Sequence, residues 1–169
     1  AVRPATIGQA GRVPGVTPAA LAIVAARVAR GSAVEKKKKN LTLELIERRL
    51  AEVGYSGPVN VDQQVTFIEL MAKWNRKINL TALPLEPIGD EAVDRLIVEP
   101  VVASQFVGDH DIRIIDLGTG GGSPAIPFRI EVQARAMRMV ESRSKKCAFL
   151  REATRTLGLQ NTSVEESRF

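Results

Sequence analysis

Residues 112–122, with the sequence Ile-Arg-Ile-Ile-Asp-Leu-Gly-Thr-Gly-Gly-Gly, decide the fold of this chain. A short β-branched run typical of a strand leads into a glycine cluster, where a sharp turn needs the positive φ angles that glycine tolerates. The following sequence predicts a strand at 136–141, a helix capped by Ser142 and ended by Gly158-Leu159, and a strand starting at 162–165. This order predicts an α/β, Rossmann-like fold, of which the chain contains the first three strands of a doubly wound sheet.

The glycine cluster has the spacing of a nucleotide-binding loop. Its acid-x-G-x-G-x-G pattern consists of Asp116, Gly118, Gly120 and Gly122. This spacing is similar to the first motif of class I methyltransferases, in which the loop holds the methionine part of S-adenosylmethionine. A dinucleotide fingerprint would need a third glycine where this chain has Ser123, which disfavours a nicotinamide-dependent oxidoreductase. A tight surface turn would have the same glycine content, so the loop alone is weak evidence.

An acid at the end of the next strand strengthens the nucleotide interpretation. Glu141 ends the predicted strand 136–141, where a carboxylate can accept hydrogen bonds from both ribose hydroxyls. Taken alone, such an acid is more often a solvated residue than a ligand. The loop and the acid meet at the switch point of one fold, and together they predict a nucleotide site.

Composition and charge restrict the class of protein. The 169 residues are 44% apolar and 25% charged, which is typical of a folded globular protein. Cys147 is the single cysteine, so the chain forms no internal disulfide, and one histidine leaves little for a zinc site. No apolar run approaches the roughly 20 residues that span a bilayer, so no membrane association is expected. The net charge is +7 over residues 1–39 and −2 over the remainder.

The N-terminal segment, residues 1–39, has the composition of a basic tail. Residues 1–16 are rich in glycine, proline and alanine and are predicted to be disordered. Thr17-Pro18 starts a predicted helix that Gly31-Ser32 ends, and Lys36 to Lys39 follow as a solvated run. Three roles stay open for this tail: a linker, a non-specific phosphate-binding arm, or an organellar transit peptide. The absence of an initiator methionine indicates a processed, trimmed or fragmentary chain.

A helical part is predicted over residues 40–108, ahead of an α/β domain at 109–169. One helix has its apolar positions between Leu41 and Val53 and stops at Gly54. Two more are predicted at about 62–78 and 89–106, the latter interrupted at Pro100.

Three segments carry a family resemblance. The sequence from Trp74 to Ala82 resembles the W-N-x-x-x-N-L-T-A signature of the bacterial RsmG/GidB family. Asp116 to Ile126 resembles the glycine loop of that family, and Val140 to Leu150 resembles its acid-S-x-x-K-K-x-x-F-L segment. Order and spacing agree from about Leu41 to Phe169, so the resemblance covers everything except the tail.

The resemblance implies methyl transfer from S-adenosylmethionine to guanine N7 in the 530 loop of 16S ribosomal RNA. It implies a cytoplasmic protein that acts on the small (30S) subunit, or an organellar protein if the tail is a transit peptide. The sequence does not report the oligomeric state, for which a monomer is expected. Guanine N7 is already a nucleophile, so positioning can supply the catalysis and no catalytic residue is assigned. No metal is expected.

The family's cofactor site is carried over onto matching positions of this chain. Gly118, Gly120 and Gly122 would form the loop, and Glu141 would hold the ribose. Ser123 stands where the family has a Phe or Leu that contacts the cofactor, and Ala125 replaces a family glycine. These two departures put the cofactor affinity in doubt. Phe169 stands where the adenine-contacting turn begins.

Basic and polar residues near the motifs are candidates for RNA contacts. Taken one by one, each of them could equally be a solvated charge or a turn cap. Trp74 is predicted to be a core anchor, Cys147 inert packing, and His110 part of a surface loop. The candidates are Arg76, Lys77, Asn79, Arg143, Lys145 and Lys146.

A rival class is a non-enzymatic homologue that binds RNA or the ribosome through a degenerate half-domain. Ser123, the basic tail and a sheet that reaches only its third strand favour this alternative. On the same grounds we expect residues 1–169 alone to be catalytically inactive.

Overall fold

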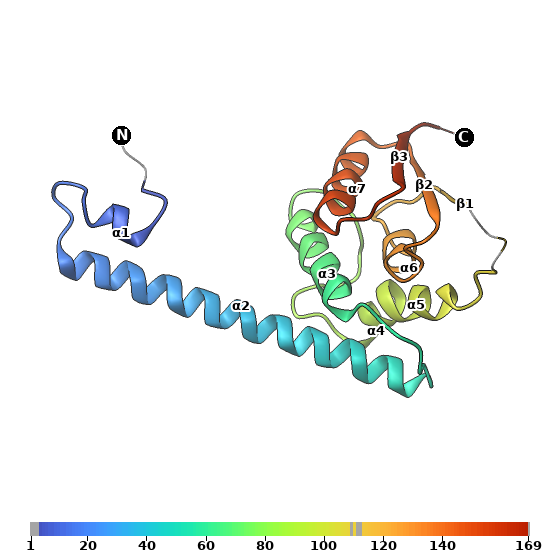
Figure 1. The fold of residues 1–169 in the computed structure, drawn as a ribbon, viewed down its shortest axis with the longest axis horizontal. Coiled ribbons are helices and arrows are strands. Elements are labelled where there is room, and N and C mark those ends of the chain that lie inside the picture. Colours follow the sequence, from blue (N-terminus) through green and yellow to red (C-terminus); the bar gives the residue numbers. More distant parts are fainter. Residues whose placement is uncertain (1–3, 109, 111–112, 169) are drawn as a thin grey trace. The chain divides into compact units, whose positions relative to one another are not determined.

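A computed structural model describes residues 4–108, 110 and 113–168 (Figure 1). The chain divides into two compact units, Ala1–Leu41 and Thr42–Phe169. Among the described residues, no helix is long and apolar enough to cross a membrane. The elements, in chain order, are α1 (Ile7–Ala10), α2 (Pro18–Glu52), α3 (Val61–Asn75), α4 (Asp90–Val93), the π-helix η1 (Asp94–Val98), α5 (Glu99–Ser104), β1 (Arg113–Leu117), α6 (Ala125–Glu131), β2 (Ala136–Glu141), α7 (Ser144–Thr156) and β3 (Thr162–Glu166).

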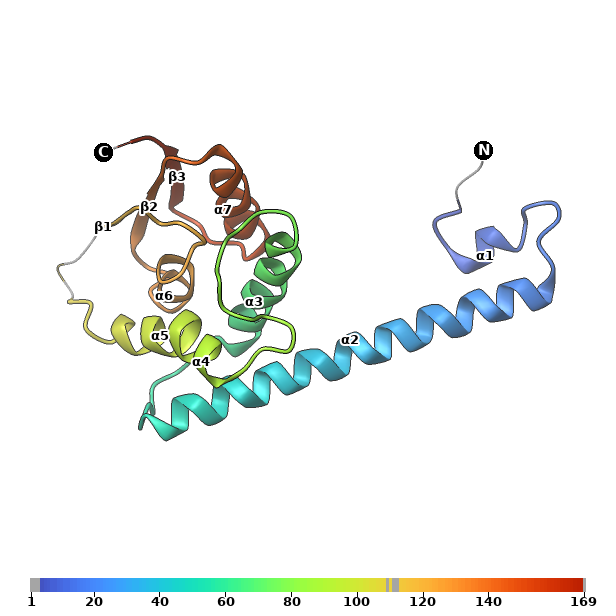
Figure 2. The same ribbon diagram turned by 180° about the vertical axis from the view of Figure 1, so that it is seen from behind.

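The three strands form one parallel sheet in the order β1-β2-β3. The connecting helices α6 and α7 lie on the same side of this sheet in both views (Figures 1 and 2). This is the arrangement expected of two right-handed connections that advance in one direction. The predicted α/β, Rossmann-like fold is therefore confirmed. The bounds of the strands agree with the prediction to within one residue, although Ile112 lies outside the described residues.

The two faces of the sheet differ in their burial. Met137 and Met139 of β2 are buried beneath the helices, and Ile114 of β1 packs against the same core. On the opposite face, the side chains of Ile115 and Leu117 are each 60% exposed. The alternation follows from the period of two in a strand, which sends neighbouring side chains to opposite faces.

An aromatic cluster joins the helical part to the α/β part. Trp74 of α3 meets Phe149 of α7 edge to face, with ring centroids 5.8 Å apart. Phe67 lies 6.4 Å from the same ring. The prediction that Trp74 is a core anchor is confirmed, and such ring pairs contribute about 0.5–1.5 kcal/mol beyond their buried area.

The last part of α2 belongs to the second unit and ends as predicted. Ile46 and Leu50 are buried in the core. The Tyr55 amide donates to the Leu50 carbonyl at 2.9 Å and the Gly54 amide to the Ala51 carbonyl at 3.0 Å. With Gly54 at φ +74°, these two bonds form a Schellman motif, which requires the left-handed conformation that glycine adopts without strain.

The predicted interruption at Pro100 is wrong. The segment from α4 through η1 to α5 stays helical across this residue. Instead of breaking, the helix widens just before the proline, where the Glu99 amide bonds the Asp94 carbonyl five residues earlier. Because proline has no backbone N–H to donate, the helix continues through a π-turn just before it. Pro100 itself lies in the first turn of α5, where a missing N–H is tolerated.

The helix predicted to start at Thr17-Pro18 does so, and the Thr17 hydroxyl accepts the Ala20 amide at 3.2 Å, but two other predictions for the N-terminal segment are wrong. Residues 1–16 were expected to be disordered, but Thr6 caps the short helix α1, accepting from the Gln9 amide at 3.2 Å. The helix that starts at Pro18 does not end at Gly31-Ser32 and includes Lys36 to Lys39. A single glycine costs a helix only about 1 kcal/mol relative to alanine, which its neighbours can offset.

We predict that Gly31→Ala stabilises α2 by about 0.5–1 kcal/mol, because alanine loses less backbone entropy in a helix. Apart from the neighbouring residues and the helix's own backbone, no heavy atom of the described residues lies within 4 Å of a Cβ added at Gly31 or at Gly54. Gly54→Ala is therefore the matched control, and it should destabilise the protein because of its positive φ. Helicity and thermal unfolding measured by circular dichroism check both. A loss of helicity in Gly31→Ala would mean that the helix ends there after all.

Candidate functional site

The glycine loop leaves β1 through three residues in the left-handed conformation. Gly118, Gly120 and Gly122 have φ angles of +77°, +61° and +87°. Other residues adopt this region only at a cost, which explains the regular spacing of the glycines. The carbonyl of Val140 on β2 accepts the Gly118 and Thr119 amides at 2.9 and 3.1 Å. These bonds fasten the loop to the neighbouring strand.

Close packing fixes the other side of the loop. A Cβ on Gly121 would lie 2.6 Å from the carbonyl oxygen of Leu80. This is too short for a contact, and only a shift of the backbone could lengthen it. A Cβ on Gly122 would lie 2.9 Å from Ile126 and 3.1 Å from Leu150. The loop is therefore held between the segment that follows α3 and the helices α6 and α7.

Asn75 holds the segment that touches the loop. Its side-chain oxygen accepts the amides of Leu80 at 2.8 Å and Thr81 at 3.1 Å, and its amide group donates to the Thr81 carbonyl at 3.0 Å. Sequence reasoning singled out Asn79, which is exposed, and missed Asn75. The signal was present, since an Asn at the end of a helix often bonds nearby backbone groups.

Glu141 closes the site from the end of β2. One carboxylate oxygen accepts the Gly120 amide at 2.9 Å, and the other accepts the Arg143 amide at 2.8 Å and the Ser142 hydroxyl at 3.3 Å. Ser142 was expected to cap α7 and bonds Glu141 instead. The structure thus brings together the predicted loop and the predicted acid. With about two acceptor positions per oxygen, the oxygen bonded to Gly120 can still accept one more donor.

The surroundings of Glu141 favour its ionised form. Burial acts to raise the pKa of this carboxyl. The amides of Arg143 and Gly120 and the ammonium of Lys146 outweigh that effect and hold the pKa below its ordinary value. Its side chain is largely buried, with 7% of the residue exposed, so the carboxylate is a fixed negative charge beside the loop.

Asp116 presents an unsatisfied carboxylate oxygen at the start of the loop. Its Oδ2 is buried and has no hydrogen-bond partner among residues 4–108, 110 and 113–168. Buried polar atoms are nearly always paired, so an orphaned acceptor next to a glycine loop is typical of a ligand position. Sequence reasoning used Asp116 only as part of the spacing and did not name it as a site residue.

Ser123 and Phe169 are the other two residues predicted to contact the cofactor. The Ser123 hydroxyl donates to the carbonyl of Leu96 in η1 at 3.0 Å, so its recorded partner is the helical segment before the sheet. Phe169 lies outside the described residues.

The basic candidates occupy two places. Arg76 and Lys77 follow α3, and Arg76 pairs with Glu86 at 2.5 Å. Arg143 precedes α7, and Lys145 and Lys146 lie in its first turn. Arg143 and Lys145 are exposed, whereas Lys146 is half-buried, with its Nζ 3.8 Å from the Cβ position of Gly120. The buried Cys147 donates to the Glu141 carbonyl at 3.2 Å, and burial raises its pKa, as expected of inert packing.

Comparison with known proteins decides the family. The model of the GidB family, described as rRNA small subunit methyltransferase G, matches residues 60–169. The chain belongs to this family. The RsmG/GidB resemblance is thereby confirmed.

Curated relatives agree with the assignment. A ribosomal RNA small subunit methyltransferase G of Stenotrophomonas maltophilia is 38% identical over 125 residues, which cover 73% of this chain and 55% of that protein. The protein of the same name from Laribacter hongkongensis is 36% identical, with 72% and 56% covered. That of Xylella fastidiosa is 40% identical over 106 residues, with 62% and 47% covered. The chain spans about half the length of the curated relatives it matches.

Two further similarities complete the comparison. Residues 1–51 match a second family model, the C-terminal helical bundle of the tRNA modifying enzyme MnmG/GidA. Among solved structures, a coclaurine N-methyltransferase bound to N-methylheliamine and SAH aligns with 81% of this chain and 49% of that chain. Its sequence identity is 18% and its TM-score 0.40, which is too low to bear on the site.

We predict that Glu141→Gln changes how stability depends on pH. Because the folded-state pKa of Glu141 is lowered, its carboxylate stabilises the fold above about pH 4.5, the ordinary value, and this contribution disappears as the pH falls through the lowered pKa. The variant should be less stable at neutral pH by about 1–3 kcal/mol and lose less stability on acidification. Urea unfolding at neutral and acid pH measures this. Glu165→Gln, an exposed acid on β3, is the control, and equal pH profiles for the wild type and Glu141→Gln would contradict the assignment.

Proposed function

We propose that this chain carries the cofactor-loop part of an enzyme that methylates guanine N7 in the 530 loop of 16S ribosomal RNA, with S-adenosylmethionine as methyl donor. The observation that carries the proposal is the loop Gly118–Gly122 bonded to Glu141 at the carboxyl ends of β1 and β2, in a chain of the GidB family. Ligands of open α/β sheets bind at this edge.

The residues at this edge fit the groups of S-adenosylmethionine. Asp116 Oδ2, which has no partner in the described part of the chain, would accept the ammonium of the methionine part. The glycine loop would let that part approach the backbone. Glu141 would accept a ribose hydroxyl at the position that its bond to Gly120 leaves open, and a second hydroxyl would displace the hydroxyl of Ser142. When bound, the cofactor supplies a methyl group on a sulfonium.

The reaction requires no acid or base catalysis by the protein. Guanine N7 has an exposed lone pair, so no residue has to remove a proton before it attacks. The protein contributes by aligning the base with the methyl group, which is a gain in proximity and orientation. This agrees with a site in which the carboxylates of Asp116 and Glu141 would hold the ligand and neither is needed as a general base.

RNA would be held through its phosphates. Arg143 and Lys145 are exposed cations immediately after Glu141, and Lys77 is exposed at the end of α3. Arg76 is already paired with Glu86 and would contribute less. Phosphate contacts of this kind position an RNA without reading its sequence.

The N-terminal unit has a separate role in this proposal. Residues 1–51 match the MnmG/GidA helical bundle, and the methyltransferase match begins at residue 60. Ile23, Val28 and Val34 of α2 are more than half exposed, which suits a helix of a bundle better than a basic arm. We propose that this segment takes no part in binding the cofactor.

We predict that the chain binds S-adenosylhomocysteine more tightly than NAD. Glu141→Ala should weaken this binding by about 1.5–3 kcal/mol, the range for a lost hydrogen bond to a charged group. Calorimetric titration of both ligands measures the difference. Glu165→Ala and a chain that starts at Asn40 are the controls, and both should bind like the wild type. Tighter binding of NAD would exclude the methyltransferase interpretation.

We predict that residues 1–169 alone transfer no detectable methyl group. The sheet has an uncovered face with Ile115 and Leu117 each 60% exposed, and β3 pairs on one side only with a described strand. A parallel sheet is normally covered on both faces, so the guanine would not be held in line with the methyl group. A labelled-methyl assay on unmethylated small subunits tests this, with a relative that spans the whole family length as positive control. Robust N7 methylation by this chain would contradict it.

A further inference from the structure

A helical turn that precedes the sheet in sequence is bonded to the glycine loop. The turn is η1, Asp94–Val98, where the helix widens to a π-turn. Pro100 has no N–H, so the carbonyl of Leu96 lacks the donor that an α-helix would supply four residues later. The hydroxyl of Ser123, directly after the glycine loop, donates to this carbonyl at 3.0 Å. A loop residue thus replaces the donor that the proline removes.

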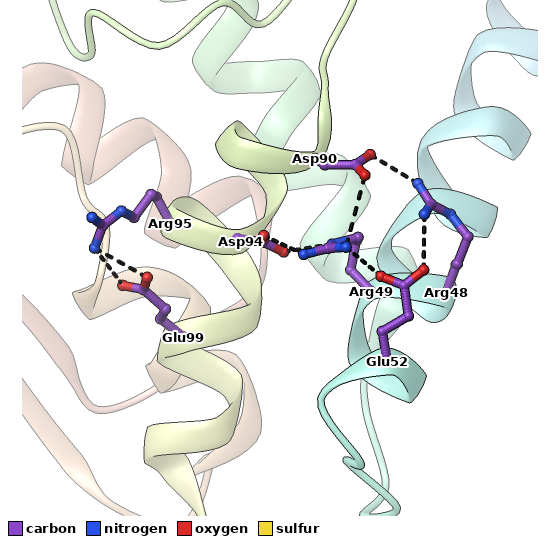
Figure 3. A network of polar contacts seen from close by, with 7 residues as sticks. All are labelled: Arg48, Arg49, Glu52, Asp90, Asp94, Arg95 and Glu99. Atoms are coloured by element: carbon purple, nitrogen blue, oxygen red, sulfur yellow. Dashed lines mark hydrogen bonds and ion pairs between the residues drawn. The ribbon is translucent and has the colours of Figure 1, made fainter.

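An ion-pair network fixes the other side of the same turn (Figure 3). Asp94, the first residue of η1, accepts from Arg49 of α2 through both carboxylate oxygens, at 2.8 and 2.5 Å. Arg48 donates to Asp90 at 2.8 Å, and Glu52 accepts from both arginines. A two-pronged arginine–carboxylate pair is directional as well as attractive, so it restricts how the turn can move. The hydrogen bond from Arg49 keeps the pKa of Asp94 below its ordinary value, so the pair stays ionised.

A second ion pair on η1 provides a contrast. Arg95 pairs with Glu99 at 3.1 Å along the same helical segment, with both side chains more than half exposed (Figure 3). Such a pair contributes little to stability or position. Asp94 differs because its partner comes from another element, the last turn of α2.

We infer that Ser123 and Asp94 are positioning residues for the cofactor loop, an inference that rests on the proposed function. Asp94, held by Arg49, fixes the turn that presents the Leu96 carbonyl, and Ser123 fastens the loop to that carbonyl. The loop is then held at three points: Val140 and Glu141 on β2, Leu80 beside Gly121, and Leu96 in η1. Ser123, which stands where the family has a Phe or Leu, contributes to the site through a backbone carbonyl.

The test compares Ser123→Ala with Ser123→Thr, which keeps a hydroxyl. Ser104→Ala is the matched control, because Ser104 also donates a hydroxyl to a carbonyl of this helical segment, that of Val101 at 2.6 Å, but does not touch the loop. The first readout is amide hydrogen exchange at Gly120 and Gly122. The second is the affinity for S-adenosylhomocysteine and for methylthioadenosine, which lacks the amino and carboxyl groups of methionine.

We expect Ser123→Ala to speed exchange at both glycines and to weaken S-adenosylhomocysteine binding about fivefold, the effect of one neutral hydrogen bond. Methylthioadenosine binding should change less, because the loop holds the methionine part. Ser123→Thr should retain most of the wild-type affinity, and Ser104→Ala all of it. Asp94→Asn should weaken binding about two- to fivefold, whereas Glu99→Gln should leave it unchanged.

Several results would overturn the inference. One is unchanged exchange at the two glycines in Ser123→Ala. Another is an equal loss of affinity for both ligands together with a matching loss of global stability, which would indicate a purely structural role. If the wild type bound no S-adenosylhomocysteine, the proposed function would fail, and the exchange measurement alone would decide the positioning role.

Discussion

The hydrogen bond from the Gly120 amide to the Glu141 carboxylate is the interaction on which the site depends. It joins the end of β1 to the end of β2 at 2.9 Å, and it exists because two parallel strands place their carboxyl ends at the same edge. Gly120 has a left-handed conformation, and its amide donates to the carboxylate at the end of the neighbouring strand. The carboxylate is kept ionised by this amide and by that of Arg143. One bond therefore fastens the loop to β2 and helps to keep a negative charge beside it.

The contacts around this bond come from segments far apart in the sequence. Leu80 limits position 121 to glycine, and Asn75 holds Leu80 in place. This gives a physical reason for the W-N-x-x-x-N-L-T-A signature, whose first Asn organises backbone while Trp74 anchors the helix to the core. These two residues of the signature therefore support the loop structurally.

The parts of the fold that could be predicted from the sequence depend on local patterns. Strand bounds, the stop at Gly54 and the meeting of the loop with Glu141 follow from β-branched runs, glycine and the parallel topology. The parts that could not be predicted depend on tertiary context. Gly31 looks like a helix end but is tolerated inside a helix, and Pro100 looks like a break but is accommodated by a π-turn. Ser123 was judged from the family pattern, and its bond to Leu96 is invisible in sequence.

The two family models match different parts of the chain, residues 1–51 and 60–169, and the composition does not reveal this division. The basic excess lies in residues 1–39, for which a linker, a phosphate-binding arm and a transit peptide stayed open, whereas residues 1–51 match the model of a helical bundle of a different RNA-modifying protein. The long helix α2 belongs to both regions: its first part lies in the N-terminal unit, and its last turn holds η1 through Arg49.

A structure of this chain with S-adenosylhomocysteine bound tests the central claim most directly. We expect the ligand at the carboxyl edge of β1 and β2, with a ribose hydroxyl on the Glu141 carboxylate and the ammonium on Asp116 Oδ2. The glycine loop should keep its conformation. A ligand bound elsewhere, or a Glu141 carboxylate that still bonds only Gly120, Ser142 and Arg143 at saturation, would contradict the account.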